Sequence, residues 1–149
     1  MRALLQRVSS AAVRVDGRIV GQIDKGFCIL LGVTHSDTNK EADWLANKIA
    51  GIRLFEDDAG KMNLGLKDVA GELLVISQFT LYGDARKGRR PSFINASRPD
   101  HSEPMYEYFV ERLREAGFKV ATGQFGADMK VEINNDGPVT LMLEREAGD

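Results

Sequence analysis

Two runs of apolar residues set the strongest limit on what this chain can fold into. Residues 26–33 and 72–76 are rich in Val, Ile, Leu and Phe, and each run has the length of a strand. An apolar run without polar alternation is typical of a strand that is covered on both faces. The sequence therefore predicts a sheet whose central strands are packed between other layers.

The flanking segments predict the rest of an α+β fold. Polar and apolar residues alternate within residues 3–15, the residues 19–23 return as a second strand, and Asp16-Gly17 between them is a hairpin signal. Further strands are expected at residues 52–55, 119–122, 129–133 and 139–143. We predict one compact domain over residues 1–149, with a mostly antiparallel, curved or barrel-like sheet and two main helices. Residues 144–149 are expected to form a frayed tail.

Two segments have the apolar spacing of helices. Thr38 and Glu41 have the spacing of a capping box in front of a helix over residues 39–50. Asp100 and Glu103 repeat that spacing before a second helix, which we expect to hold Pro104 in its first turn and to end at Gly117. Between the helices, residues 82–99 are rich in Gly, Arg, Ser and Pro and predict a long loop, and loops of this length are functional or disordered.

Composition narrows the class of protein. Of the 149 residues 43% are hydrophobic, no run of about 18 apolar residues exists, and the N-terminus is too charged for a signal peptide. We expect a soluble, cytoplasmic protein without membrane contact, in which the single Cys28 is a buried and inert thiol. The net charge of −2 argues against nonspecific coating of nucleic acid. One dense basic run could still meet an anion locally, and it consists of Arg86, Lys87, Arg89 and Arg90.

Two short polar segments are not explained by the needs of a core. The first, Ser77-Gln78-Phe79-Thr80, follows a buried strand, and a strand that continued through it would turn Gln78 and Thr80 toward one pocket. The second contains Gly137-Pro138, a backbone of restricted conformation that suits the rejection of one enantiomer by steric clash. Neither segment supplies the histidine pattern or metal ligands of a conventional hydrolase, so no cofactor or metal ion is expected.

These segments resemble the two motifs of the D-aminoacyl-tRNA deacylases, the family that includes the D-tyrosyl-tRNA deacylases. Residues 77–81 resemble the first motif and residues 135–140 the second. The resemblance extends in collinear order over nearly the whole chain, with supporting matches at residues 6–8, 60–63, 90–93, 108–110 and 123–129. The main departure is the segment after Leu143.

The resemblance implies a specific activity and assembly. Family members are homodimers of a barrel-like α+β fold that hydrolyse the ester joining a D-amino acid, or glycine mischarged on tRNA-Ala, to the terminal adenosine of tRNA. By this resemblance the Gly137-Pro138 bond is cis and enters the pocket of the other subunit, where it orients the substrate's amino group and excludes L-amino acids. Arg7 and Met129 would support the site. The residues around the scissile carbonyl and the adenosine would be Ser77, Gln78, Phe79 and Thr80.

Several chemistries remain open for such a site. Water could attack the aminoacyl carbonyl while backbone N–H groups near Phe79 and Thr80 stabilise the oxyanion. Thr80 could instead be a covalent nucleophile, although no base is visible in the sequence, or the ribose hydroxyl of the tRNA could assist while Thr80 positions the substrate. Two other classes compete: a metal-free esterase of other aminoacyl or peptidyl esters, and a noncatalytic RNA-binding module that uses the basic run.

Overall fold

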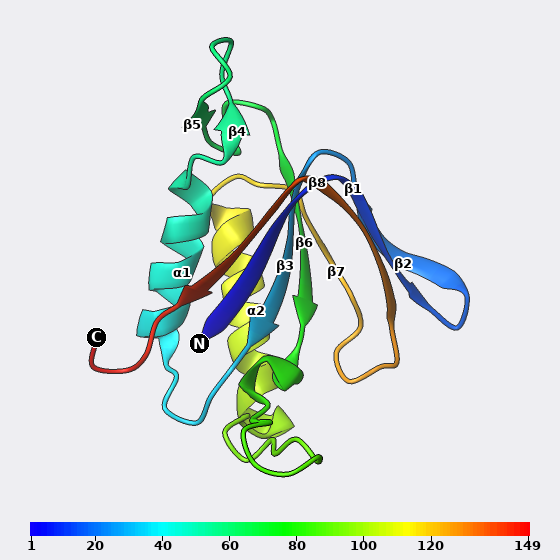
Figure 1. Ribbon diagram of the computed structural model, residues 1–149, viewed down its shortest axis with the longest axis vertical. Coiled ribbons are helices and arrows are strands. Elements are labelled where there is room, and N and C mark those ends of the chain that lie inside the picture. The colour runs from blue at the N-terminus through cyan, green and yellow to red at the C-terminus, as the bar shows by residue number, and fades with distance from the viewer.

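The two apolar strands expected from the sequence lie side by side in the middle of one sheet (Figure 1). In the computed structural model, which describes residues 1–149, β3 (Gly26–Gly32) pairs in parallel with β6 (Glu72–Ser77). The strand order is β2-β1-β3-β6-β7, and the additional strand β8 pairs with β1. These other strands are β1 (Arg2–Val15), β2 (Arg18–Ile23), β7 (Val120–Thr122) and β8 (Lys130–Glu144).

The sheet is mostly antiparallel and curls into a nearly closed barrel. β1 runs antiparallel to β2, β3 and β8, whereas β6 is parallel to both of its neighbours. The edge strands β2 and β7 approach closely, because a Cβ atom on Gly21 would lie only 2.4 Å from the carbonyl oxygen of Thr122. The glycine permits this backbone contact, and the α+β barrel-like fold expected from the sequence is confirmed.

Two helices, α1 (Asn39–Gly51) and α2 (Pro99–Glu115), lie together on one side of the sheet (Figure 1). They share a buried apolar cluster with alternate residues of β1, β3 and β6, while a smaller cluster fills the space between those strands and β2. The capping box of α1 is present as expected. Thr38 N donates to a carboxylate oxygen of Glu41 at 2.7 Å, and Thr38 Oγ1 accepts a hydrogen bond from Lys40 N at 3.3 Å. No helix is long and apolar enough to cross a membrane.

The structure corrects the expected start of the second helix. α2 begins at Pro99 rather than after Asp100, and its N-cap residue Arg98 makes no side-chain capping bond. Pro104 therefore lies inside the helix and not in its first turn. Pro99 opens the helix because its ring presets the first helical φ and its missing N–H has no partner there. Gly117 follows the helix with φ +98°, as expected for a left-handed cap.

Two strand predictions are also wrong in extent. The strand expected at 52–55 is reduced to β4 (Phe55–Glu56), which pairs with β5 (Met62–Leu64) in a small separate hairpin. The strands expected at 129–133 and 139–143 are one continuous strand, β8, because both halves pair with β1. The last residues also contact the body of the protein, since Arg145 N donates to Met1 O at 3.0 Å and its guanidinium lies 4.9 Å from the Trp44 ring.

Candidate active site

The first motif leaves β6 in a tight turn. The strand ends at Ser77, and the next residues form the 3-10 helix η1 (Phe79–Tyr82), so the expected continuation of the strand is wrong. Gly32 explains the turn, because a Cβ atom there would lie 3.2 Å from Gln78 O and 3.1 Å from the side chain of Leu81. η1 thus folds over a position without a side chain. The turn still brings Gln78 and Thr80 together, since Gln78 Nε2 donates a hydrogen bond to Thr80 Oγ1.

Two backbone donors at the start of η1 are free. The first N–H groups of a helix have no partner within the helix, and the N–H groups of Phe79 and Thr80 donate no hydrogen bond in the structure. Both residues are exposed. The only side-chain partner of Thr80 Oγ1 within hydrogen-bond distance is the amide of Gln78, and no carboxylate or imidazole bonds it. This arrangement offers donors for an oxyanion but no base for a threonine nucleophile.

A cavity of about 530 Å³ opens beside this turn. It contains four of the residues expected at the site, namely Ser77, Gln78, Phe79 and Met129, whereas Thr80 lies outside its lining. Most of the remaining wall is apolar and comes from the end of β3 and the residue after it, the loop before α2, the segment between β7 and β8, and β8 itself, including Leu31, Val33, Phe93, Ala96, Phe125 and Val131. A cavity of this size, with apolar walls and a few polar groups, accommodates a flat aromatic group such as a nucleobase.

Sequence reasoning assigned no role to several residues of this cavity. Phe93 and Phe125 lie in segments that supported the family resemblance, so their position along the chain was the available signal. Ser97 gave no signal, because nothing in the sequence shows that the end of the long loop folds back under β3. Its backbone N donates to Val33 O at 2.9 Å, and this contact places the hydroxyl at the cavity wall.

The second motif interrupts the ladder between β1 and β8. Gln6 pairs with Thr140 and Val8 with Asn135, so residues 136–139 stand opposite the single residue Arg7. The Gly137-Pro138 peptide bond is cis, as the family resemblance implied, and both residues are exposed. Asn135 closes the loop by donating from Nδ2 to Arg7 O and Val139 O, each at 3.0 Å.

The side chain of Arg7 anchors this loop from below. It is only 6% exposed, and it donates from Nη1 to Leu54 O at 2.7 Å and from Nε to Asp136 O at 3.2 Å. Its Nη2 atom lies 3.0 Å from the place where a Cβ atom on Gly137 would stand. A buried cation that donates to two carbonyl oxygens fixes the loop in one conformation. The supporting role of Arg7 in the site stays a prediction.

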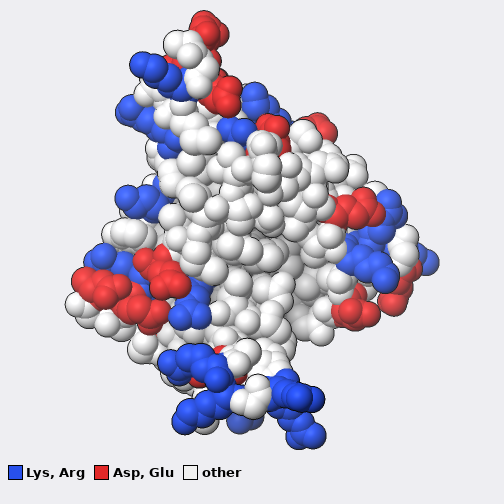
Figure 2. Space-filling view, in the orientation of Figure 1, with Lys and Arg blue, Asp and Glu red and all other residues white.

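Within one chain, the two motifs do not share a pocket. Arg2 pairs with Gly32, against which η1 packs, whereas Arg7 faces the cis-proline loop. Five residues of an antiparallel strand separate these levels by about 17 Å, and neither Gly137 nor Pro138 lines the cavity. Between the two motifs lies a surface formed by outward side chains of β1, β3 and β8. We call it the β1–β8 face, and it consists of Leu4, Gln6, Leu30, Thr140 and Met142. Figure 2 shows hardly any Lys, Arg, Asp or Glu over the middle of the molecule.

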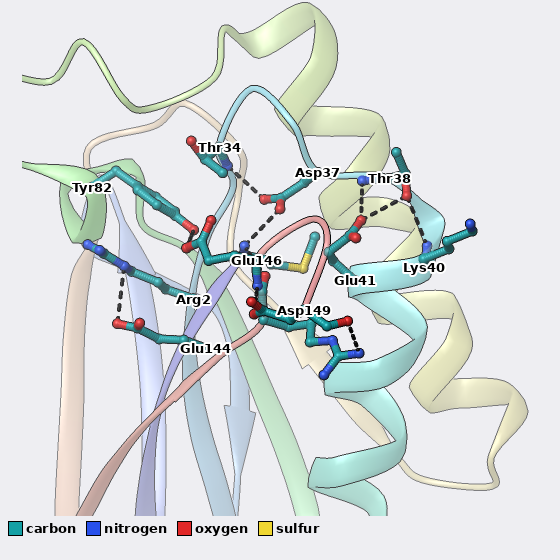
Figure 3. A network of polar contacts seen from close by, with 12 residues as sticks. Arg2, Thr34, Asp37, Thr38, Lys40, Glu41, Tyr82, Glu144, Glu146 and Asp149 are labelled. Carbon is teal, nitrogen blue, oxygen red and sulfur yellow. Dashed lines mark hydrogen bonds and ion pairs between the residues drawn. The ribbon is translucent and has the colours of Figure 1, made fainter.

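A polar network behind η1 ties the turn to the chain ends (Figure 3). Arg2 makes the contacts with the turn: Nη1 donates to Leu81 O at 2.7 Å, Nε lies 3.2 Å from a carboxylate oxygen of Glu144, and the guanidinium lies 4.4 Å from the centre of the Tyr82 ring. Because Gly32 has no side chain, Arg2 reaches across it to the turn. Burial is the main cause that raises the pKa of the Tyr82 hydroxyl, so that ring stays neutral.

The expected basic run lies on an exposed loop at one end of the molecule, where Figure 2 shows a group of Lys and Arg side chains. Asp84 and Ser92 close this loop with two backbone hydrogen bonds of 2.7 and 2.8 Å. Arg86 bonds both carboxylate oxygens of Asp84, and these hydrogen bonds lower the pKa of Asp84 to about 2. The charges of Lys87, Arg89 and Arg90 have no such partner, so the loop carries a net positive charge.

The two histidines and the single cysteine lie outside the cavity and contact only the protein itself. His35 Nε2 lies 2.7 Å from Ile94 O and His101 Nε2 lies 2.9 Å from Asp37 O, so each imidazole holds a loop. Cys28 is completely buried, as expected, and burial raises the pKa of its thiol to about 12. No group of three or more His, Cys, Asp or Glu side chains is arranged to hold a metal ion.

Comparison with known proteins places this geometry in a family. The family model described as D-Tyr-tRNA(Tyr) deacylase matches residues 4–144. The chain is 58% identical over 147 residues to a D-aminoacyl-tRNA deacylase of Exiguobacterium sp. (strain ATCC BAA-1283 / AT1b), covering 99% of this chain and 100% of the relative. It is 56% identical over 144 residues to the protein of the same name from Clostridioides difficile (strain 630), covering 97% of each.

Two solved structures share the fold. The c-Myc DNA Unwinding Element Binding Protein superposes with a TM-score of 0.92 at 41% identity, covering 99% of this chain and 100% of the other. A probable eukaryotic D-amino acid tRNA deacylase has a TM-score of 0.84 at 17% identity, covering 95% and 97%, which is a likeness of fold alone. With its two motifs, its barrel and relatives this similar over their whole length, the chain belongs to the D-Tyr-tRNA(Tyr) deacylase family.

Proposed function

We propose that this protein hydrolyses the ester bond of D-aminoacyl-tRNA in the cytoplasm, releasing a free D-amino acid and tRNA. One observation carries the proposal: the bonded pair of Gln78 and Thr80 stands with two free N–H groups at the mouth of an apolar cavity. The names of the relatives at 56 to 58% identity supply the substrate class. The cavity would take the terminal adenosine, which leaves the ester at the free N–H groups.

The proposed chemistry is attack by water. The water oxygen bonds to the aminoacyl carbonyl carbon, the N–H groups of Phe79 and Thr80 bind the developing oxyanion, and the ribose oxygen leaves with a proton. Thr80 Oγ1 accepts a hydrogen bond from Gln78, so its own proton is free to point at the substrate. This geometry favours Thr80 as a donor that positions the substrate rather than as the attacking atom. The 2′-hydroxyl of the ribose is the partner we assign to that donor.

The site is completed by a second copy of the chain. The β1–β8 face has few charges and separates the two motifs by about 17 Å, which is too far for one aminoacyl group to touch both. Pairing this face about a two-fold axis would bring Gly137-Pro138 of one subunit onto η1 of the other. The exposed cis-proline carbonyls would then orient the substrate's amino group, and the rigid loop would exclude an L-side chain by clash.

A filter that works by steric clash with a side chain would not exclude glycine. Glycine has no side chain to clash with the loop, so glycyl-tRNA, including glycine mischarged on tRNA-Ala, would pass as a second substrate. The unpaired cations of the basic loop, Lys87, Arg89 and Arg90, would bind phosphates of the acceptor end, with Arg86 contributing less because Asp84 already pairs with it.

The test is a comparison of D- and L-aminoacyl-tRNA charged with the same amino acid, with a chelator present. Hydrolysis of the D-form at least a hundredfold faster than the L-form is expected, on the order of 2.7 kcal/mol of discrimination. Equal rates would contradict the chiral filter, and loss of activity with chelator would contradict a metal-free reaction. Hydrolysis of peptidyl-tRNA would favour a general esterase, and strong salt-dependent RNA binding without product would favour an RNA-binding module.

A further inference from the structure

The loop before α2 presents apolar side chains to solvent next to the cavity. Ile94 is 76% exposed and Phe93 39% exposed, and the ring of Phe93 contacts Phe79, which is 55% exposed. The two rings pack edge to face with centroids 5.2 Å apart. No other place in the chain groups three exposed large apolar side chains in this way. Single exposed apolar side chains are common on protein surfaces, whereas a contiguous group of them is typical of a binding surface.

The exposure of these side chains is fixed by the backbone around them. Ile94 O bonds His35 Nε2 at 2.7 Å, and Asn95 O accepts a hydrogen bond from Thr34 Oγ1 at 2.6 Å. Ala96 N donates to Phe93 O at 3.0 Å, which closes a turn around the exposed residues. The surface is therefore held in place before any partner arrives, so little ordering cost opposes binding.

The charge beside this surface identifies the kind of partner. Residues 85–91 form an exposed loop that ends just before Phe93. This loop carries the unpaired cations Lys87, Arg89 and Arg90. Figure 2 shows that Lys and Arg dominate this end of the molecule. Aromatic and apolar side chains next to a positive loop are what single-stranded nucleic acid needs, since bases stack on the first and phosphates pair with the second.

We infer that Ile94, together with the exposed part of the Phe93 side chain outside the cavity, forms an apolar platform for the unpaired nucleotides that precede the terminal adenosine of the substrate. This inference rests on the proposed function and extends it, because the cavity beside Phe79 takes only the last nucleoside. Ile94 lies outside the cavity lining, so it can touch the strand only before the strand enters. The loop of residues 85–91 then holds the phosphates of the same nucleotides.

The experiment uses two substrates that share the ester, D-aminoacyl-tRNA and D-aminoacyl-adenosine. In the full-length Ile94→Ser variant, kcat/KM for the tRNA should fall several-fold through a higher KM, because serine removes the apolar surface against which a base packs. Hydrolysis of D-aminoacyl-adenosine should stay unchanged. Ile19→Ser is the matched control, because Ile19 is 44% exposed on β2 in a different part of the molecule, and it should leave both rates unchanged.

Each other outcome overturns the platform. An equal loss on both substrates would place Ile94 in the support of the cavity, and no loss on tRNA would show that the strand passes elsewhere. A change of oligomeric state in Ile94→Ser, measured by sedimentation, would assign the surface to contact between copies of the chain. If the unaltered protein cleaved D-aminoacyl-adenosine and D-aminoacyl-tRNA with equal kcat/KM, the platform would be wrong while the proposed reaction stood; cleavage of neither would reject the reaction itself.

Discussion

At the scale of single residues, the chemistry of the site depends on which polar groups already have a hydrogen-bond partner. The hydroxyl of Thr80 accepts a hydrogen bond from Gln78, whereas the N–H groups of Phe79 and Thr80 are free. A group that already has a hydrogen-bond partner is held in one orientation and can position the substrate. A free N–H group can stabilise the negative charge that develops on the substrate during the reaction. The roles we assign to side chain and backbone of Thr80 therefore differ.

Replacement of Thr80 separates these roles. Thr80→Val keeps the shape of the side chain and the backbone N–H but removes the hydroxyl. If the hydroxyl positions the substrate through one hydrogen bond, kcat should fall about tenfold to a hundredfold, whereas loss of a covalent nucleophile costs on the order of 10⁴-fold or more. Single-turnover deacylation of D-aminoacyl-tRNA measures the difference. Thr80→Ser, which restores a hydroxyl, should return most of the rate, and a complete loss in the valine variant would restore the nucleophile hypothesis.

Cys28 provides a prediction about pH. Burial raises the pKa of its thiol from 9.0 to about 12, so the native protein holds this proton more tightly than the unfolded chain does. The stability from this group is complete below pH 9 and is lost as the pH rises toward 12, at up to about 1.4 kcal/mol per pH unit. The free energy of unfolding of Cys28→Ala should therefore fall less steeply than that of the unaltered protein between pH 9 and 10.5. Parallel slopes would contradict this assignment.

At the scale of elements, sequence patterns were sufficient where local chemistry decides the structure. The hairpin at Asp16-Gly17, the buried strands β3 and β6 and the capped helix α1 follow from neighbouring residues alone. The errors lie where distant contacts decide. Residues 129–143 look like two strands with a turn, but both halves pair with β1 and form one strand. Gly32 has no side chain, so the chain after Ser77 can turn over it into η1 where a strand was expected.

The candidate site divides in the same way. The residue types of both motifs were recognisable, and the structure brings Ser77, Gln78, Phe79 and Met129 to one cavity. The bond between Gln78 and Thr80 arises from a helical turn rather than from the strand alternation that first suggested it. Ser97 and Arg2 were not foreseen, because their positions depend on pairing with Val33 and Gly32, which are far away in the sequence.

The contacts behind η1 predict that Arg2 acts on catalysis through the turn. Arg2→Ala removes the bond to Leu81 O and the contact with the Tyr82 ring, so Gln78 and Thr80 should lose their fixed placement. We expect kcat to fall several-fold on both D-aminoacyl-tRNA and D-aminoacyl-adenosine, with little change in KM. Arg2→Lys should recover only part of the rate, because an ammonium cannot make all three contacts of the guanidinium.

A matched control for Arg2 exists on the same pair of strands. Arg14 of β1 forms an ion pair with Glu132 of β8 at 2.8 Å, at the other end of the ladder from η1. Arg14→Ala should leave kcat unchanged. A similar loss of kcat in both variants would mean that the ladder as a whole is weakened, and that Arg2 has no particular link to the turn.

At the scale of the whole molecule, the proposed site between two subunits predicts complementation between two defective chains. Thr80→Ala damages the turn, and Gly137→Ala damages the loop, because the new Cβ would lie 2.9 Å from Val139 Cγ2 at a φ of +119°. In a mixed dimer, one of the two sites contains neither change. After random exchange of subunits in an equal mixture, the activity should reach about a quarter of normal, above the residual activity of either variant alone.

The mixing experiment has a clear negative result. If both motifs served a site within one chain, no mixture of these variants would exceed the sum of their separate activities. Subunit exchange is verified independently by native mass spectrometry of the mixed sample. Exchange without restored hydrolysis would reject the intersubunit site.

The ladder between β1 and β8 also determines when the site can exist during synthesis. β1 is the first strand to be made and β8 the last, so the loop opposite Arg7 can form only after the rest of the chain is complete. Until then, one edge of the 14-residue β1 has no partner, and a long unpaired edge recruits strands of other chains. Interrupted translation near residue 130 is therefore expected to yield aggregates, and not a folded protein that lacks only the cis-proline loop.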